Sequence, residues 1–135
     1  EQALLFSLIE GQEHNYSDAL RDRDRSIAPK HVRLVEHYIE EHAADPITIE
    51  QLVAVSGVSG RALFDGFKRF RNTSPMAHLR ACRMRRVREA LLKPTPDVTV
   101  SRLAQDWGFY ELGRFAGQYR KLYGETPSET LRRAR

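Results

Sequence analysis

An internal repeat limits what this 135-residue chain can fold into more than any other feature of its sequence. The segment TIEQLVAVSG (48–57) matches TVSRLAQDWG (99–108) at an offset of 51, with a threonine, a β-branched residue, a leucine and a glycine in register. The second copy then gains one residue. Four further pairs match at an offset of 52: Leu63 and Phe115, Phe67 and Tyr119, Lys68 and Arg120, and Pro75 and Pro127. The chain therefore contains two copies of one supersecondary unit.

Each copy has the pattern of two helices joined by a tight turn. The glycine of the turn, Gly57 or Gly108, can adopt the positive φ that such a turn needs. A small residue four positions before the glycine, Val53 or Ala104, lets the two helices cross closely. An apolar residue directly after the glycine, Val58 or Phe109, packs over the corner between the two helices. One such match is weak evidence, but two at a fixed offset predict a pair of helix-turn-helix units.

The sequence around the two copies also predicts helices. Apolar residues recur at helical spacing behind Pro29, which predicts an amphipathic helix over 30–43. An arginine-rich helix is expected between the copies, over about 75–92. Thr126 and Glu129 have the spacing of a capping box at the start of a final helix. We find no convincing strand, so the predicted fold class is all-α.

Charge is distributed unevenly along the chain. Residues 1–28 carry three arginines against six acidic residues, whereas residues 29–135 carry nineteen lysines and arginines against twelve acidic residues. A basic domain behind an acidic leader points to a polyanionic partner, most often nucleic acid. The alternative is a solvated surface with surplus cations. Most of the cations are arginine, however, which favours phosphate and base recognition.

Several other classes of protein are disfavoured. No apolar run approaches the roughly 20 residues that span a bilayer, and no signal peptide is visible. The single Cys82 excludes an internal disulfide framework; we interpret it as a small buried apolar residue in a protein of the reducing cytoplasm. The five histidines lack metal-ligand spacing, and there is no phosphate loop or nucleophile elbow. We therefore expect no catalysis, no metal and no cofactor.

The second copy, LAQDWGFYELGRFAGQYRKLYGETPSETLRR, resembles the second helix-turn-helix of AraC/XylS-type transcription regulators. SGVSGRALFDGFKRF and the helix after it resemble the first unit and the connecting helix, and the letters GRF are closest to the XylS branch. The resemblance covers about 29–135. It implies two helix-turn-helix subdomains (about 48–71 and 99–122) joined by the helix at 75–92. Residues 1–28 would be the linker and tail of an upstream effector or dimerisation domain.

The resemblance places the base contacts of the first unit on a helix over about 60–71. At about 100° per residue, the core face of this helix contains Leu63, Phe67 and Phe70. The positions that would contact bases are Arg61, Phe64 and Asp65. Arginine can pair with guanine, aspartate can accept from cytosine, and phenylalanine can meet a thymine methyl. Two alternatives stay open: Asp65 pairs with Arg61 or Arg69, or Phe64 packs inward.

The second recognition helix, about 111–122, has a different outer face. Its predicted core side contains Phe115, Tyr119 and Leu122. The groove-facing residues are small, namely Gly113, Ala116 and Gly117. Arg114 is the one long donor near the helix start, and the resemblance to the XylS branch suggests that it contacts a base. Glu111 replaces the family's usual serine at the helix start, which weakens the expected cap. We therefore expect this unit to depend more on close approach and DNA shape.

Phosphate contacts are expected from basic and hydroxyl side chains on or beside the two recognition helices. The candidates are Ser59, Lys68, Arg69, Arg80, Arg83, Arg120 and Lys121. Five arginines, at positions 80, 83, 85, 86 and 88, surround the apolar stripe of the connecting helix, which contains Leu79, Val87 and Leu91. A charged helix face is more often solvated than bound, so we expect no more than two of the five to contact phosphate.

The resemblance implies a sequence-specific DNA-binding module of a bacterial transcription regulator, usually an activator. Its partners would be double-stranded promoter DNA and RNA polymerase. A small-molecule effector would bind the upstream domain, and the full-length protein could be a dimer. The alternative is a basic helical module that binds an acidic protein without sequence-specific DNA binding.

Overall fold

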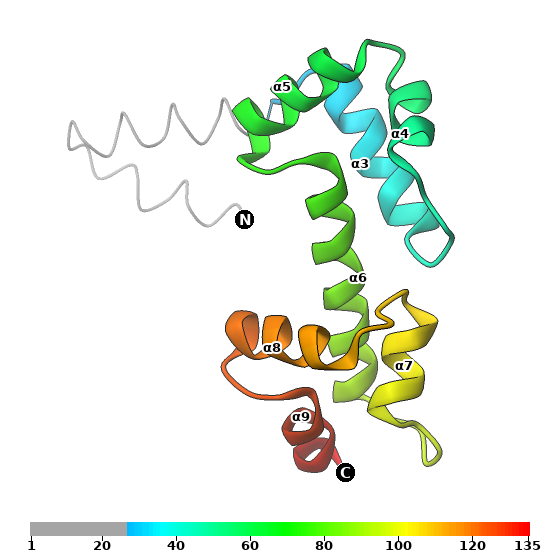
Figure 1. The fold of residues 1–135 in the computed structure, drawn as a ribbon, viewed down its shortest axis with the longest axis vertical. Coiled ribbons are helices and arrows are strands. Elements are labelled where there is room, and N and C mark those ends of the chain that lie inside the picture. The colour runs from blue at the N-terminus through cyan, green and yellow to red at the C-terminus, as the bar shows by residue number, and fades with distance from the viewer. Residues whose placement is uncertain (1–26) are drawn as a thin grey trace, which may run out of the picture. The chain divides into compact units, whose positions relative to one another are not determined.

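The computed structural model describes residues 27–135, and every regular element in this range is an α-helix (Figure 1). The helices are α3 (Lys30–His42), α4 (Ile49–Ser56), α5 (Gly60–Arg71), α6 (Pro75–Leu92), α7 (Val100–Asp106), α8 (Leu112–Tyr123) and α9 (Pro127–Ala134). The predicted all-α class, and the helices expected over 30–43, 60–71 and 75–92, are confirmed. The predicted linker and tail fall almost entirely within residues 1–26, which lie outside the described residues.

The chain divides into two compact units, and each contains one copy of the sequence repeat. The described part of the first unit comprises 27–36 and Glu50–Pro75, which includes α5 and all of α4 except its first residue, Ile49. The second comprises His37–Ile49 and Met76–Arg135, which includes α6 to α9. The connecting helix α6 is therefore part of the second unit rather than a free spacer.

The first unit is built around the turn between α4 and α5. Gly57 has a φ of 74°, as the turn pattern predicted. The buried Ser56 hydroxyl donates to the Val53 carbonyl oxygen at 2.6 Å and accepts from the Val58 amide at 3.1 Å, so the turn satisfies its own polar groups. Ser59 caps α5 by accepting from the Ala62 amide at 3.1 Å. These local bonds determine where the outer helix starts.

Helices α3 and α5 approach each other closely at Gly66. A Cβ at this glycine would lie 2.6 Å from His31 Nε2 and 2.8 Å from Val32 Cγ2, which is closer than real Cβ atoms come to other atoms. Leu63 and Phe67 beside it are fully buried. Phe70, predicted to share this core face, is only half-buried, and the Arg69 guanidinium lies 5.3 Å from its ring centroid. The core face of α5 is therefore narrower than predicted.

The second unit has one apolar core that α6, α7 and α8 share. Its buried members are Met84, Val87, Leu91, Ala104, Phe115 and Tyr119. Gly108, with a φ of 89°, forms the turn between α7 and α8, and Phe109 behind it packs against this core. The ring of Phe109 lies 4.9 Å from that of Phe115, so the predicted corner residue covers the turn.

Leu122 was predicted to belong to this core, and that prediction is wrong because its side chain is 60% exposed. Tyr123 packs there instead, with its ring 4.8 Å from that of Tyr119. The buried stripe of α8 contains Phe115 and Tyr119. At about 100° per residue, Leu122 and Tyr123 flank this stripe on opposite sides, so the helical period leaves both as candidates and packing against Tyr119 decides between them.

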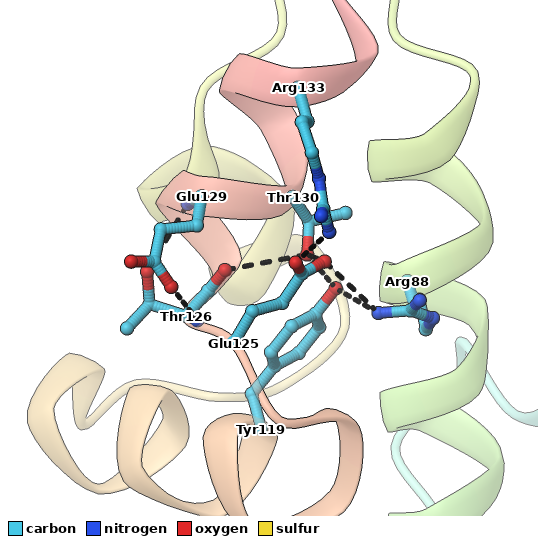
Figure 2. Close-up of polar contacts among 7 residues, drawn as sticks. All are labelled: Arg88, Tyr119, Glu125, Thr126, Glu129, Thr130 and Arg133. Carbon is cyan, nitrogen blue, oxygen red and sulfur yellow. Dashed lines mark hydrogen bonds and ion pairs between the residues drawn. The ribbon is translucent and has the colours of Figure 1, made fainter.

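A polar network joins α9 to α8 and α6 (Figure 2). The buried Tyr119 hydroxyl donates to Thr130 Oγ1 at 2.8 Å and accepts from Arg88 Nη1 at 3.1 Å. Thr130 Oγ1 donates to Glu125, which also pairs with Arg133 and lies 3.7 Å from Arg88. The predicted capping box is confirmed at the start of α9, where Thr126 and Glu129 bond reciprocally.

Candidate nucleic-acid interface

The outer face of α5 presents the three predicted base-contacting residues to solvent. Arg61 and Asp65 are exposed, and Phe64 is 44% exposed although it is a large apolar residue. The opposite face of the same helix, with Leu63 and Phe67, is completely buried. Phe64 therefore does not pack inward, which removes one of the two alternatives left open by the sequence.

The other alternative concerned the carboxylate of Asp65. Within the described residues, Asp65 forms no ion pair with Arg61 or with Arg69, although each is four positions away. The Arg69 guanidinium instead lies over the ring of Phe70. The outer face of α5 thus offers a guanidinium, an aromatic ring and a carboxylate that are not engaged with one another. Their contact with bases stays a prediction.

The outer face of α8 is smooth, as the sequence predicted. Gly113 and Gly117 are exposed, Ala116 is half-buried, and a Cβ built on either glycine meets no atom within 4 Å. Glu111 occupies the cap position of α8 without making a side-chain cap hydrogen bond, so the expected weakening of the cap is confirmed. Neither glycine is needed for packing or for a positive φ. Arg114 is the one exposed arginine in the first turn of this helix.

The same substitution should have opposite effects on stability at two glycines of α5 and α8. Gly66→Ala should lower the free energy of unfolding by about 1–2 kcal/mol, because overpacking against α3 outweighs the gain in helix propensity. Gly117→Ala should raise it by up to about 1 kcal/mol, since its Cβ meets open space. Urea denaturation measures both. An unchanged or higher stability of Gly66→Ala would show that α3 and α5 do not meet closely there.

Most of the predicted phosphate-contacting side chains are accessible. Ser59, Lys68, Arg69, Arg80, Arg120 and Lys121 are all exposed. Lys68, Arg69, Arg120 and Lys121 lie in the last turns of α5 and α8, and Ser59 caps the start of α5. Their accessibility is compatible with contacts to a DNA backbone, and those contacts stay predictions.

The arginines of α6 are largely committed to contacts within the second unit. Arg83 donates to the backbone oxygens of Ala43 and Asp45, both at 2.7 Å, and Arg85 and Arg86 pair with Glu40. Arg88 takes part in the network of Figure 2. Arg80 is the one arginine of the five that is exposed and has no such partner among the described residues. The structure thus favours Arg80 over Arg83 as a phosphate contact.

Charges around Glu40 and Cys82 follow from the same packing. Burial alone would raise the pKa of Glu40, but the hydrogen bond and charge of Arg85, with help from Arg86, hold that pKa below its usual value. Burial raises the pKa of the Cys82 thiol, and the nearby Glu40 carboxylate adds to the effect. Cys82 is therefore a buried thiol with little thiolate character, in agreement with its predicted structural role.

One surface feature of the second unit was not predicted from the sequence. Arg80, Arg83 and Arg114 converge on a groove of 390 Å³, together with the turn residues Phe109 and Tyr110. Tyr110 is 77% exposed, whereas Phe109 before it packs into the core. The sequence did contain a sign of this exposed aromatic residue. Two consecutive aromatic residues follow Gly108, and only one of them can pack over the turn.

No group of histidine, cysteine and acidic side chains in the part of the chain that the structure describes could hold a metal ion. No helix between residues 27 and 135 combines the length and the apolar character that crossing a bilayer requires. The features that stand out are the two helix-turn-helix units and the cations around them. Together they define a helix-turn-helix DNA-binding domain.

Comparison with known proteins identifies the family. A family model described as "Helix-turn-helix domain" matches residues 52–133. The "Probable thc operon regulatory protein" of Rhodococcus erythropolis is 39% identical over 132 residues, which cover 97% of this chain and 40% of that protein. The "XylDLEGF operon transcriptional activator 2" of Pseudomonas putida is 39% identical over 98 residues, which cover 72% of this chain and 62% of that protein.

A solved structure agrees with these relatives. The crystal structure of a probable AraC family transcriptional regulator from Rhodopseudomonas palustris CGA009 superposes with a TM-score of 0.76 at 45% identity, covering 79% of this chain and 99% of that one. The chain belongs to the AraC/XylS family of transcription regulators and contains its DNA-binding domain. It spans less than two thirds of the length of the curated relatives named above.

Proposed function

We propose that this chain binds one preferred double-stranded DNA sequence through the outer faces of α5 and α8. The observation that carries the proposal is the outer face of α5. It exposes Arg61, Phe64 and Asp65, which suit hydrogen bonding and apolar contact with base edges, while its opposite face is buried. Asp65 in particular would be repelled by phosphate, and a hydrogen bond from a base donor would offset that repulsion.

The two units would contribute differently to binding. In the first unit, Arg61, Phe64 and Asp65 would discriminate between bases, while Ser59, Lys68 and Arg69 would contact phosphate. In the second unit, Arg114 would contact a base. The open surface at Gly113, Ala116 and Gly117 would let the helix backbone approach the groove floor, with Arg120 and Lys121 on phosphates. Each unit would occupy its own segment of major groove.

Binding of the chain to duplex DNA at two salt concentrations tests this proposal. Phosphate contacts predict that affinity falls steeply as salt rises, and base contacts predict preference for a duplex selected from a random pool over random competitor. Equal binding to selected and random duplexes would overturn sequence-specific recognition. Weak binding to any duplex at low salt would favour the alternative, a basic module for an acidic protein.

Asp65→Ala tests whether the carboxylate discriminates between bases. Removing an acceptor that contacts cytosine N4 should change the preferred base at one position of the selected site and reduce discrimination there by about 1–3 kcal/mol. Repeating the selection from a random pool with the variant measures this preference. Glu50→Ala is a suitable control, because it removes an exposed carboxylate from the first turn of α4. An unchanged preference would leave Asp65 as a solvated surface residue.

For the whole protein, we propose a bacterial transcription regulator, an activator, that acts in the cytoplasm. The relatives from Pseudomonas putida are named transcriptional activators, which supports this direction of control. A small-molecule effector would bind a separate domain, RNA polymerase would be contacted at the promoter, and two copies could associate. A reporter gene placed behind the selected site would distinguish activation from repression. Lower expression in the presence of the protein would contradict the proposal.

A further inference from the structure

The groove of the second unit brings together positively charged side chains that would favour binding of an anion. It is formed by residues of α6, by the turn that begins at Gly108 and by the first two turns of α8. Three of its lining side chains, Arg80, Arg83 and Arg114, carry positive charge, and Glu111 is its one lining carboxylate. Like charges gathered in one concave surface repel one another unless a counter-charge is supplied.

The three arginines are not equivalent. Arg83 is held in place by the backbone oxygens of Ala43 and Asp45 and lies against Gly108, where its Nη1 would be 3.2 Å from an added Cβ. Its side chain is therefore fixed, but its charge is not neutralised by those carbonyl groups. Arg80 and Arg114 are exposed and lie on different helices, α6 and α8. The groove thus has one fixed cation and two that can adjust to a bound group.

Tyr110 is the feature of this groove that packing does not explain. It follows Phe109, which packs over the turn, and precedes Glu111, which occupies the N-cap position of α8. Its side chain is 77% exposed and lines the groove, so the ring contributes little to the core. A phenol in this position offers one O–H donor beside the guanidinium groups. A hydroxyl donor among arginine side chains is chemistry that suits a phosphodiester group.

We propose that this groove binds a backbone phosphate of the DNA, with the Tyr110 hydroxyl and Arg80 as its direct contacts and Arg83 as a fixed charge behind them. The inference rests on the proposed function and adds Tyr110 as a DNA-contacting residue. Phosphate contacts determine the position of a protein on the duplex. A phosphate contact beside the start of α8 would therefore position this helix along the DNA so that Arg114 reaches its base. This positioning matters because the other residues of α8 predicted to face the groove are small.

Tyr110→Phe tests the proposal because it removes only the hydroxyl. The variant should fold with the same thermal midpoint, since the side chain is exposed, and should bind the selected duplex roughly threefold to tenfold more weakly. The loss should be the same on random duplex, and the salt dependence should not change, because no charge is removed. Arg80→Gln should reduce the slope of log affinity against log salt concentration by about one, as expected for the loss of one phosphate contact. Tyr38→Phe, outside the groove, is the matched control and should bind as the unaltered chain does.

Duplexes with single neutral methylphosphonate groups locate the contact. The unaltered chain should lose affinity when the phosphate that enters the groove is neutralised. Tyr110→Phe should lose less at that position and the same as the unaltered chain elsewhere. The inference would be overturned if Tyr110→Phe bound with the affinity of the unaltered chain. It would also be overturned if each methylphosphonate weakened the binding of Tyr110→Phe and of the unaltered chain by the same factor at every position. A defect in Tyr110→Ala that Tyr110→Phe does not share would overturn it as well. Lack of sequence preference in the unaltered chain would instead overturn the proposed function, so the two failures are distinguishable.

Discussion

Replacing Arg61 by alanine is expected to weaken binding to the preferred duplex by about 1–3 kcal/mol, roughly fivefold to 150-fold, and to relax the preference at one base pair. Arg61 is exposed on the outer face of α5, and its planar guanidinium can donate two hydrogen bonds to the major-groove edge of guanine. Titration of selected duplexes carrying each of the four base pairs at that position measures both effects.

Arg69→Ala is the matched control for Arg61. It removes the same side chain from the same helix, but at a position predicted to contact phosphate. It should weaken binding to selected and random duplexes by similar factors and should reduce the salt slope by about one. If Arg61→Ala behaved in the same way, Arg61 would be a phosphate contact, and base discrimination by α5 would depend on Phe64 and Asp65 alone.

Replacing Glu125 by alanine is expected to lower the free energy of unfolding by about 2–3 kcal/mol. The Glu125 side chain is 13% exposed and accepts a hydrogen bond from Thr130 (Figure 2). It also balances the charge of Arg88, whose own side chain is 27% exposed. Without the carboxylate, Thr130 keeps only the more distant Thr126 carbonyl oxygen, at 3.4 Å, as its acceptor. Arg88 then keeps a partly buried charge without a counter-charge. Urea denaturation measures the change.

Two further variants separate hydrogen bonding from charge at this network. Glu125→Gln keeps an acceptor for Thr130 and should cost less than Glu125→Ala. Arg88→Met combined with Glu125→Ala removes both charges, so the double variant should be destabilised by less than the sum of the single effects. Strictly additive losses would show that Arg88 and Glu125 do not interact across their 3.7 Å separation.

The positions of the helices could be predicted from the sequence because their signals are local. Ser59 and Thr126 bond to amides three residues away, and Gly57 and Gly108 have the positive φ that their turns require. The internal repeat also predicted which helices pair to form each helix-turn-helix unit. The outward direction of Arg61, Phe64 and Asp65 followed from the period of α5 once Leu63 and Phe67 were assigned to the core.

Other features could not be predicted because they depend on residues far apart in the chain. The helical period left Leu122 and Tyr123 as similar candidates for the core, and packing against Tyr119 selected Tyr123. The arginines of α6 looked alike in sequence. Arg83 bonds to backbone oxygens about 40 residues away, and Arg88 bonds to the Tyr119 hydroxyl. A charge pattern indicates that cations are present but not which of them already have partners.

The sequence by itself determined the class of fold, the two helix-turn-helix units and the side of α5 that faces outward, because caps, turn glycines and helical periodicity act over a few residues. Only the tertiary structure decided which charged and aromatic side chains stay available for DNA. That choice depends on packing. Hydrogen bonds and ion pairs within the fold hold Arg83, Arg85, Arg86 and Arg88 in place, whereas Arg80 and Tyr110 are left exposed beside an open groove.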